Sequence, residues 1–273
     1  MAIIADCHLH SSFSGDSEAS MEDMIKAGID KGLKFMCFTE HQDFEYIHID
    51  GYPDDYFEVN TDQYLYHLLS LRDKYKSQIR VNFGIELGMQ DHLSRKNAIY
   101  AKSHDFDFII ASSHLCNGKD PYYKEFFEGR DETEAYHEYF KYISECISSC
   151  MSFDVYGHLD YILRYGPNKN AHFTYGEYAE DIDKILNRLI DNGKGIEVNS
   201  SGFAYGMHGP HPSMEILLRY KELGGELITI GSDAHKPEDV ARGFKETEEL
   251  LLECGYKFYS VFDGRMPEMF RLG

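Results

Sequence analysis

The sequence predicts an α/β fold built around a parallel sheet, and two patterns along the chain lead to this prediction. First, seven short apolar runs alternate with segments whose apolar residues recur at helical spacing. The runs are apolar throughout, as parallel strands buried on both faces should be. They span residues 2–6, 34–38, 79–85, 106–111, 153–156, 195–198 and 227–230. A closed barrel and an open doubly wound sheet fit this alternation almost equally.

The second pattern is an asymmetry in the connections. The segments that lead from a run to the next helix are long, and they cover residues 42–60, 115–130, 159–176 and 202–212. Long loops after the strands build the working face of a parallel barrel or sheet. Helices are expected at 21–29, 64–72, 136–150, 178–189 and 216–220, and a weaker pattern covers 91–102. Ser20 and Thr61 are the predicted N-caps of the first two helices.

Length and composition limit the class of protein. The 273 residues show no linker or low-complexity tract, so we expect one domain over 1–273. The net charge of −20 argues against a nucleic-acid binder, because an acidic chain repels a phosphate backbone. No run is long enough to span a membrane, and the N-terminus does not resemble a signal peptide. Six cysteines without a CxxC pair are typical of free buried thiols, so we expect a cytoplasmic protein. The sequence does not indicate an oligomeric state.

Histidines mark the ends of the predicted strands. Of the 14 histidines, six stand at or just after the end of a run: His8, His10, His41, His114, His158 and His235. Carboxylates and one amide occupy the same kind of position, namely Glu40, Glu86, Asp233 and Asn199. The carboxyl ends of parallel strands converge on one mouth, so these side chains should meet there.

A metal site is the interpretation that accounts for the whole set. A single histidine at a strand end is more often a hydrogen-bonded loop residue than a ligand. That interpretation fails for the set, because several imidazoles and carboxylates in one cavity need cations to organise them. Imidazole and carboxylate ligands suit Zn, Fe or Mn, and the number of ligands favours two or three divalent ions over one.

These residues resemble the polymerase and histidinol phosphatase (PHP) family. The matching motifs are Asp6-Cys7-His8-Leu9-His10, Ser14-Gly15-Asp16, Thr39-Glu40-His41, Glu86, Ser113-His114, Gly157-His158 and Gly231-Ser232-Asp233-Ala234-His235. They occur in order from residue 6 to residue 235. The resemblance implies a distorted (β/α)7 TIM-like barrel with a trinuclear metal site at the C-terminal ends of the strands.

The resemblance also implies a ligand set for each metal ion. The first ion would be held by His8, His10, Glu86 and Asp233. The second would share Glu86 and add His114 and His158. The third would use Asp16, His41 and His235. Some members of the family have histidine where this chain has Asp16, which affects the preferred metal because either residue can ligate.

Within the family, the chain is most similar to the monofunctional histidinol-phosphate phosphatases of bacterial histidine biosynthesis. The segments that support this subgroup are 157–164, 197–202 and 211–213. The resemblance implies hydrolysis of L-histidinol phosphate to L-histidinol and phosphate. The alternative is a PHP phosphoesterase acting on another phosphomonoester, such as a nucleotide, an oligonucleotide end or phosphotyrosine. A metal-sensing domain without activity is disfavoured, because it should have lost ligands and all nine positions are filled.

Phosphomonoester hydrolysis defines the roles that we expect for the site residues. Two adjacent metal ions lower the pKa of bound water and so supply a hydroxide at neutral pH. We expect Glu86 to join these ions, and Asp233, ahead of His235, to give the leaving oxygen its proton.

Four residues of the long loops are candidates for binding the substrate. Arg164 has the planar guanidinium that suits bidentate contact with phosphate, although pairing with nearby acids is an alternative role. His172, His208 and His211 lie in similar loops and are weaker candidates for the phosphate, since most loop histidines contact no ligand. The aromatic and acidic residues of 42–60 and 115–130 suit a cationic aromatic leaving group, or form only a solvated surface.

Overall fold

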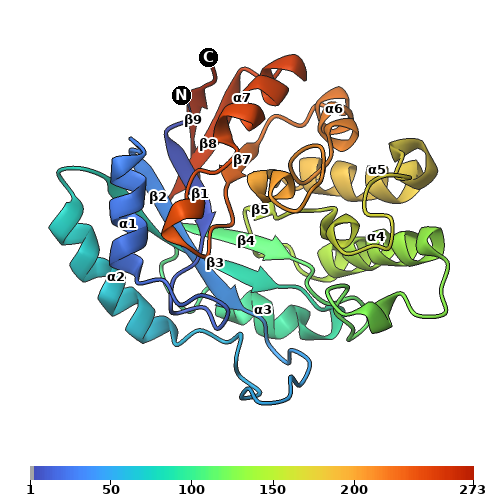
Figure 1. Cartoon of the computed structure of the whole chain (residues 1–273), viewed down its shortest axis with the longest axis horizontal. Coiled ribbons are helices and arrows are strands. Elements are labelled where there is room, and N and C mark those ends of the chain that lie inside the picture. Colours follow the sequence, from blue (N-terminus) through green and yellow to red (C-terminus); the bar gives the residue numbers. More distant parts are fainter. Residues whose placement is uncertain (1–2) are drawn as a thin grey trace.

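The fold is a parallel barrel of seven strands surrounded by helices (Figure 1). The structure is a computed structural model that describes residues 3–273, so residue 2 of the predicted run 2–6 lies outside the described residues. The strands follow one another around the sheet in chain order. They are β1 (Ala5–Leu9), β2 (Phe35–Gln42), β3 (Arg80–Gly88), β4 (Phe108–Ser112), β5 (Val155–Tyr156), β6 (Gly195–Asn199) and β7 (Ile228–Gly231).

All seven predicted runs overlap their strands, and the strands extend up to four residues beyond the ends of the runs. The extension has a physical cause. The last residues of several strands are polar site residues such as Glu40, His41 and Glu86, so the apolar pattern stops before the strand does.

The barrel is nearly closed, because the first strand meets the segment that follows the last. The backbone N–H of Asp233 donates to the carbonyl of His8 at 2.8 Å, and the N–H of His10 donates to the carbonyl of Ala234 at 2.9 Å. The open doubly wound sheet, which the sequence pattern also allowed, is therefore excluded. The two hydrogen bonds also hold the end of β1 against the loop that carries Asp233.

Helices connect the strands and cover the outside of the barrel. They are α1 (Met21–Asp30), α2 (Thr61–Tyr75), α3 (Ser94–Tyr100), α4 (Glu132–Ser149), α5 (Tyr175–Asp191), α6 (Met214–Glu222) and α7 (Phe244–Glu253). Ser20 caps α1 as predicted, with its side chain accepting from the N–H of Asp23. The predicted cap of α2 is wrong by one residue, because the side chain of Asn60 accepts from the N–H of Gln63 instead. The sequence analysis did not predict α7.

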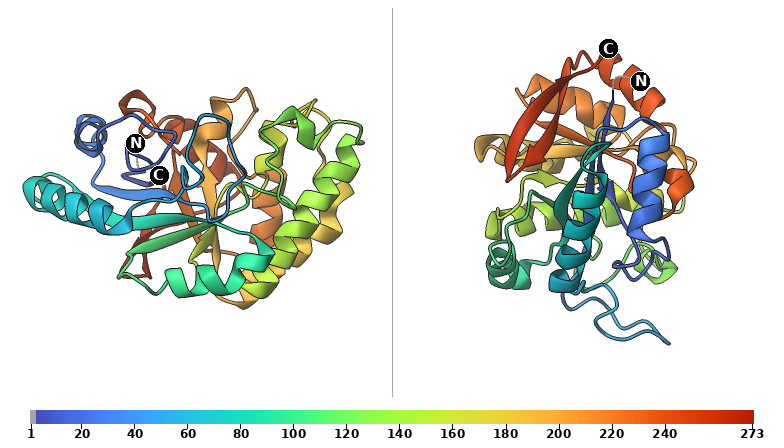
Figure 2. Two further views of the ribbon diagram at one scale, coloured as in Figure 1. Left: turned by 90° about the horizontal axis from the view of Figure 1, so that it is seen from below. Right: turned by 90° about the vertical axis from the view of Figure 1, so that its left-hand side faces the viewer.

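A C-terminal hairpin, also absent from the prediction, packs against the N-terminal ends of the strands (Figure 2). It consists of β8 (Phe258–Asp263) and β9 (Met266–Arg271), which pair antiparallel. Asn82 at the start of β3 donates to the carbonyl of Phe262 at 2.6 Å, and the Arg265 Nε lies 2.5 Å from Asp154 just before β5. The hairpin thus covers the end of the barrel opposite the predicted site.

One cluster of buried apolar side chains runs from Ile3 to Leu272, so all the layers share a core. The six cysteines are free and buried, as predicted. Among residues 3–273, no helix has the length and apolar character that crossing a bilayer requires.

Candidate active site

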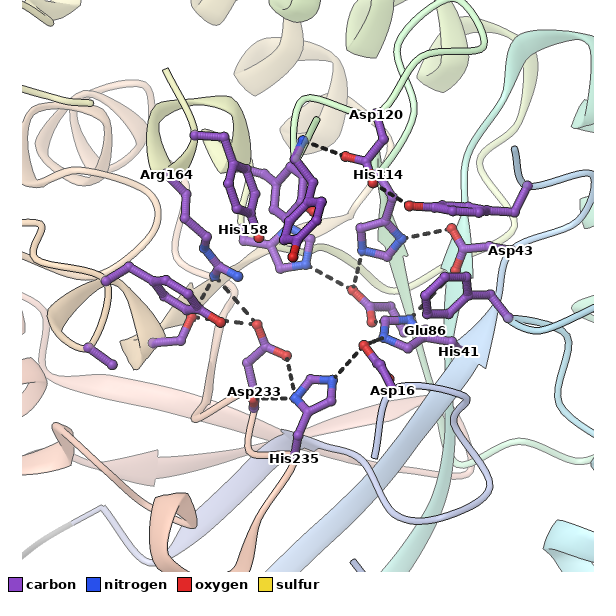
Figure 3. A pocket seen from close by; sticks show the side chains of 18 of the residues that line it. Asp16, His41, Asp43, Glu86, His114, Asp120, His158, Arg164, Asp233 and His235 are labelled. Atoms are coloured by element: carbon purple, nitrogen blue, oxygen red, sulfur yellow. Dashed lines mark hydrogen bonds and ion pairs between the residues drawn. The ribbon is translucent and has the colours of Figure 1, made fainter. Parts of the chain in front are cut away.

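The predicted ligands converge at the C-terminal end of the barrel, around a cavity of about 700 Å³ (Figure 3). Seven of them line this cavity: Asp16, His41, Glu86, His114, His158, Asp233 and His235. His8 and His10, both on or just after β1, are fully buried and contact Glu86 and Asp233. All nine predicted metal ligands are therefore part of one cluster.

Glu86 lies at the centre of the cluster and is fully buried. Its Oε2 is 3.3 Å from His8 Nε2, 3.5 Å from His10 Nε2 and 3.0 Å from His41 Nδ1. Its Oε1 is 2.9 Å from His158 Nε2 and 3.2 Å from His114 Nε2. Each carboxylate oxygen thus faces its own group of imidazoles, which is the arrangement expected of a carboxylate that joins two ions.

Asp16 forms a second focus of the cluster at the mouth of the cavity. Its Oδ2 lies 3.2 Å from His235 Nε2 and 3.5 Å from His41 Nε2. Burial alone would raise the pKa of Asp16, but the two imidazoles outweigh burial and hold that pKa well below its usual range. The ring of His10 stacks between those of His41 and His235, with centroids 4.2 Å apart in each case.

Hydrogen bonds orient four of the imidazoles for ligation through Nε2. Their Nδ1 atoms each lie near an oxygen acceptor: His8 at 2.6 Å from Glu197, His114 at 2.7 Å from Asp43, His10 at 3.1 Å from Ser14 Oγ, and His235 at 2.9 Å from the Asp233 carbonyl. A ring that donates its Nδ1–H keeps a lone pair on Nε2. Ligating histidines are usually held in this way by a second group.

The buried polar atoms of the cluster fit a cation better than an extended hydrogen-bond network. Among the described residues, His158 Nδ1 is buried without a hydrogen-bond partner, and Glu86 Oε2 and His41 Nδ1 make no hydrogen bond although they lie 3.0 Å apart. Burial disfavours a charged His8, yet Glu197, Glu86 and Asp233 outweigh burial and raise its pKa well above the usual value. Burial and the neighbouring rings of His235 and His41 lower the pKa of His10 to about 3. The carboxylates of the cluster thus favour a positive charge beside them, which a proton or a metal ion can supply.

The ligand atoms fall into overlapping groups. Four groups bring their ligand atoms close enough to hold an ion: His8-His10-Asp233, His8-Glu86-His158, His41-Glu86-His114 and His10-His41-His235. His158 thus groups with His8, and His114 with His41, while His114 and His158 also share Glu86 Oε1, as in the set predicted for the second ion. The physical reason is that Glu86 reaches both sides of the cluster, so its neighbours belong to overlapping groups.

Comparison with known proteins identifies the family. The sequence model of the PHP domain matches residues 6–201, which is more than half of the chain. The chain belongs to the PHP domain family. A probable histidinol-phosphatase from Clostridium acetobutylicum is 32% identical to this PHP protein over 255 residues, covering 93% of this chain and 95% of the relative. The histidinol-phosphatase of Lactococcus lactis is 30% identical, covering 95% of this chain and 94% of the relative.

A solved PHP structure supports the same relationship. The crystal structure of histidinol phosphate phosphatase from Lactococcus lactis superposes with a TM-score of 0.87 at 28% identity, covering 97% of this chain and 98% of the other. That crystal structure is a complex with Zn, L-histidinol and phosphate. The nearly closed barrel of seven parallel strands confirms the fold class predicted for this PHP domain.

Arg164 lines the cavity of this PHP domain, as the sequence analysis predicted for a residue facing the mouth. It ends a short 3-10 helix, Tyr161–Arg164, and is only 6% exposed. Its Nη2 donates to Ser201 Oγ at 2.6 Å and lies 3.5 Å from Asp233 Oδ2, while the guanidinium carbon lies 4.1 Å from the centroid of the Tyr205 ring. These contacts hold the guanidinium beside the cluster (Figure 3).

The structure does not bring the three predicted loop histidines to the cavity. His172 and His208 are exposed and do not line it. His211 is fully buried, with Nδ1 2.5 Å from Asp160 Oδ1, and its backbone pairs with that of Asn199. The cavity therefore does not support these residues as substrate contacts, because the position of a residue in a loop does not specify where its side chain points.

Sequence reasoning missed the residues that hold the ligands. Glu197 on β6 and Asp43 after β2 orient His8 and His114. Glu40 stands among the candidate ligands in the sequence. In the structure it instead accepts one hydrogen bond from the Ser11 hydroxyl and one from the Ser14 hydroxyl, each at 2.5 Å. The signal that could have found Glu197 is a carboxylate in the interior of an otherwise apolar run.

Proposed function

We propose that this PHP protein is a metal-dependent phosphomonoesterase that hydrolyses L-histidinol phosphate to L-histidinol and phosphate. The observation that carries the proposal is one cluster of nine imidazole and carboxylate side chains with Glu86 at its centre, beside a cavity that Arg164 also lines. The substrate follows from relatives named histidinol-phosphatases that align with more than nine-tenths of the chain. It also follows from the similar Lactococcus lactis structure with L-histidinol and phosphate.

The cluster would hold two or three divalent ions, with Zn, Mn or Fe as the candidates suited to imidazole and carboxylate ligands. Glu86 would be shared, because its two oxygens face different groups of imidazoles. Bound divalent ions lower the pKa of coordinated water and offset the charge of the phosphoryl oxygens. Glu197, Asp43 and Ser14 keep the ligating rings in one orientation and one tautomer.

Arg164 and Asp233 would act on the substrate itself. The Arg164 guanidinium offers N–H donors to the phosphoryl oxygens from a fixed position over Tyr205. Burial opposes ionisation of Asp233, but His8, His10, His235 and Arg164 outweigh it and hold the pKa well below its usual range. Asp233 is therefore ionised at neutral pH, so its carboxylate would take a proton from the attacking water and then pass that proton to the leaving oxygen. His235, less buried and nearer the mouth, is the second candidate for this proton transfer.

The direct test is phosphate release from a panel of phosphomonoesters by the purified, metal-reconstituted enzyme. We expect kcat/KM for L-histidinol phosphate to exceed that for p-nitrophenyl phosphate, a nucleotide and phosphotyrosine. We also expect a strong chelator to abolish turnover and Zn, Mn or Fe to restore it. Equal turnover of all substrates would contradict the substrate assignment, and full activity with less than one equivalent of metal would contradict the multinuclear site.

A further inference from the structure

Asp120 is a buried carboxylate that lines the cavity away from the ligand cluster. It lies in the loop between β4 and α4 and is 4% exposed. Its Oδ1 accepts a 2.7 Å hydrogen bond from the backbone N–H of Tyr122, and its Oδ2 accepts one from the hydroxyl of Tyr46. Figure 3 shows Asp120 beyond His114, with Arg164 and Asp233 on the other side of the cavity.

No basic side chain in the described part of the chain forms an ion pair with Asp120. The other carboxylates that line the cavity each lie within ion-pairing distance of a basic side chain: Asp16 near His235, Asp43 near His114, Glu86 near His158, Asp233 near Arg164 and Asp239 near Arg242. No Lys, Arg or His lies that close to Asp120 among residues 3–273. Burial raises the pKa of Asp120 above its usual value, although Tyr46 and the N–H of Tyr122 partly offset the effect. A cationic ligand would stabilise this carboxylate.

An aromatic wall joins Asp120 to Arg164. Tyr122, whose backbone binds Asp120, packs on Tyr165 with ring centroids 5.4 Å apart. Tyr165 packs on Tyr161 at 5.0 Å, and the guanidinium carbon of Arg164 lies 5.3 Å from the Tyr161 centroid. A ligand with its phosphoryl group near Arg164 and the metal ligands would therefore lay its body along these rings. Any cationic group at its far end would meet Asp120.

We infer that Asp120 binds the ammonium group of the leaving alcohol and makes this enzyme selective for phosphate esters of amino alcohols. The inference rests on the proposed function and adds to it the group that recognises the leaving half. A primary ammonium suits this position better than an imidazole, because the ammonium stays charged at neutral pH and carries three donors. The flat rings of the wall are the natural contact for the imidazole.

The variant that isolates this charge is Asp120→Asn, because an amide keeps both existing hydrogen bonds. Its oxygen can accept from the N–H of Tyr122, and its NH2 can donate to the Tyr46 hydroxyl, which accepts as well as donates. Folding and metal content should therefore be retained. Asp239→Asn is the matched control, since it removes the same charge from the same cavity at a carboxylate already paired with Arg242.

The experiment compares three substrates on these variants: L-histidinol phosphate, its analogue without the amino group, and p-nitrophenyl phosphate. For Asp120→Asn we expect kcat/KM for L-histidinol phosphate to fall roughly 10- to 100-fold, the range of a hydrogen bond between charged groups. The other two substrates should change by less than about twofold, and Asp239→Asn should leave all three within that limit. L-Histidinol should lose affinity as a competitive inhibitor by the same factor as the substrate, while inorganic phosphate should not.

Three results would overturn the inference. Equal losses on all three substrates would assign Asp120 a structural role, and an unchanged preference for L-histidinol phosphate would place the ammonium elsewhere. An equal loss on the analogue without the amino group would show that Asp120 binds the imidazole instead. The substrate assignment of the proposed function fails separately, if the unaltered enzyme shows no preference for L-histidinol phosphate.

Discussion

Glu197 reaches His8 across an intervening strand, with its Oε1 2.6 Å from Nδ1 of the imidazole. Glu197 is on β6 and His8 on β1, and β7 lies between them in the nearly closed barrel. The two side chains can meet across β7 because the residue of β7 between them is Gly231, which has no side chain. A Cβ at Gly231 would lie 2.3 Å from His8 Cβ and 2.6 Å from Glu197 Oε1, closer than real Cβ contacts allow. Gly231 therefore keeps open the contact that aims His8 Nε2 at the cluster.

Glu197→Gln should weaken metal binding, because a neutral amide lowers the basicity of the His8 ring that it orients. Replacing groups that hold a ligating histidine typically costs about 10- to 100-fold in metal affinity. Chelator competition with metal analysis measures the change. Glu226→Gln, which alters an exposed glutamate in the same way, should have no effect. Unchanged metal affinity in Glu197→Gln would show that the hydrogen bond serves packing alone.

Glu86→Gln should be the most damaging single change in the cluster. Its two oxygens face separate groups of imidazoles, so the loss of its charge disturbs both at once. Replacements of Asp16, His41 or His235 should retain more metal and more turnover, because these residues gather at the mouth. Metal content and kcat measured on the same preparations compare the variants. Near-normal turnover and full metal in Glu86→Gln would show that Glu86 does not join two ions.

The residues of the cluster were predictable because their chemistry and their position coincide. His8, His41, Glu86 and His114 are polar residues that follow apolar runs. They interrupt the apolar pattern at the strand ends, where parallel strands converge. The groups behind them were harder to see, since Glu197 acts across β7 and only closure of the barrel brings it to His8. Contacts between strands that are not neighbours in the sequence leave little local signal.

The C-terminal hairpin and the orientation of the loop histidines were missed for different reasons. Asp263-Gly264 between two apolar stretches is a recognised hairpin signal, so β8 and β9 were within reach of the sequence analysis. The loop histidines were not, because His172 is exposed while His211 is buried against Asp160. Both lie in long loops after strands, and only the folded path of each loop decides which side chain faces the cavity.

Arg265→Ala should destabilise the fold without affecting the metal cluster. The Arg265 Nε lies 2.5 Å from the buried Asp154 and joins the hairpin to the start of β5. Removing the partner of a buried carboxylate lowers the free energy of unfolding by about 3–5 kcal/mol. Because Arg265 is partly exposed, we expect a smaller loss of about 1–3 kcal/mol. Denaturant unfolding measures the loss, and turnover with full metal should stay unchanged.

The loss in Arg265→Ala should also depend on pH. Burial raises the pKa of Asp154 in the folded protein above its ordinary value, and Arg265 opposes this rise. Without Arg265 the folded pKa is higher still, so the folded state holds a proton that the unfolded state releases. Stability then falls as pH rises through that folded pKa. The difference in unfolding free energy between variant and unaltered protein should be larger at pH 8 than at pH 5, and a difference independent of pH would show that Asp154 is not its source.

Arg164→Ala should raise KM and lower kcat/KM for L-histidinol phosphate, because a charge-assisted contact with the phosphoryl group is lost. A hydrogen bond to a charged group is worth about 1.5–3 kcal/mol, which corresponds to roughly 10- to 150-fold. Metal content should not change, since arginine does not ligate. The sequence alone placed Arg164 in a loop with little part in packing, whereas the side chain is buried over Tyr205, so unfolding must be measured alongside turnover.

Arg164→Lys separates the charge from the shape of the guanidinium. Lysine keeps a positive charge near Asp233 but loses the planar fork and the second donor, so it should recover only part of the activity lost in Arg164→Ala. Inorganic phosphate as a competitive inhibitor should follow the same order, with the tightest binding to the unaltered enzyme. If both variants stay folded and fully metallated with unchanged KM, kcat and phosphate affinity, then Arg164 only supports Ser201 and Asp233. The metal ions and their ligands would in that case hold the phosphoryl group without Arg164.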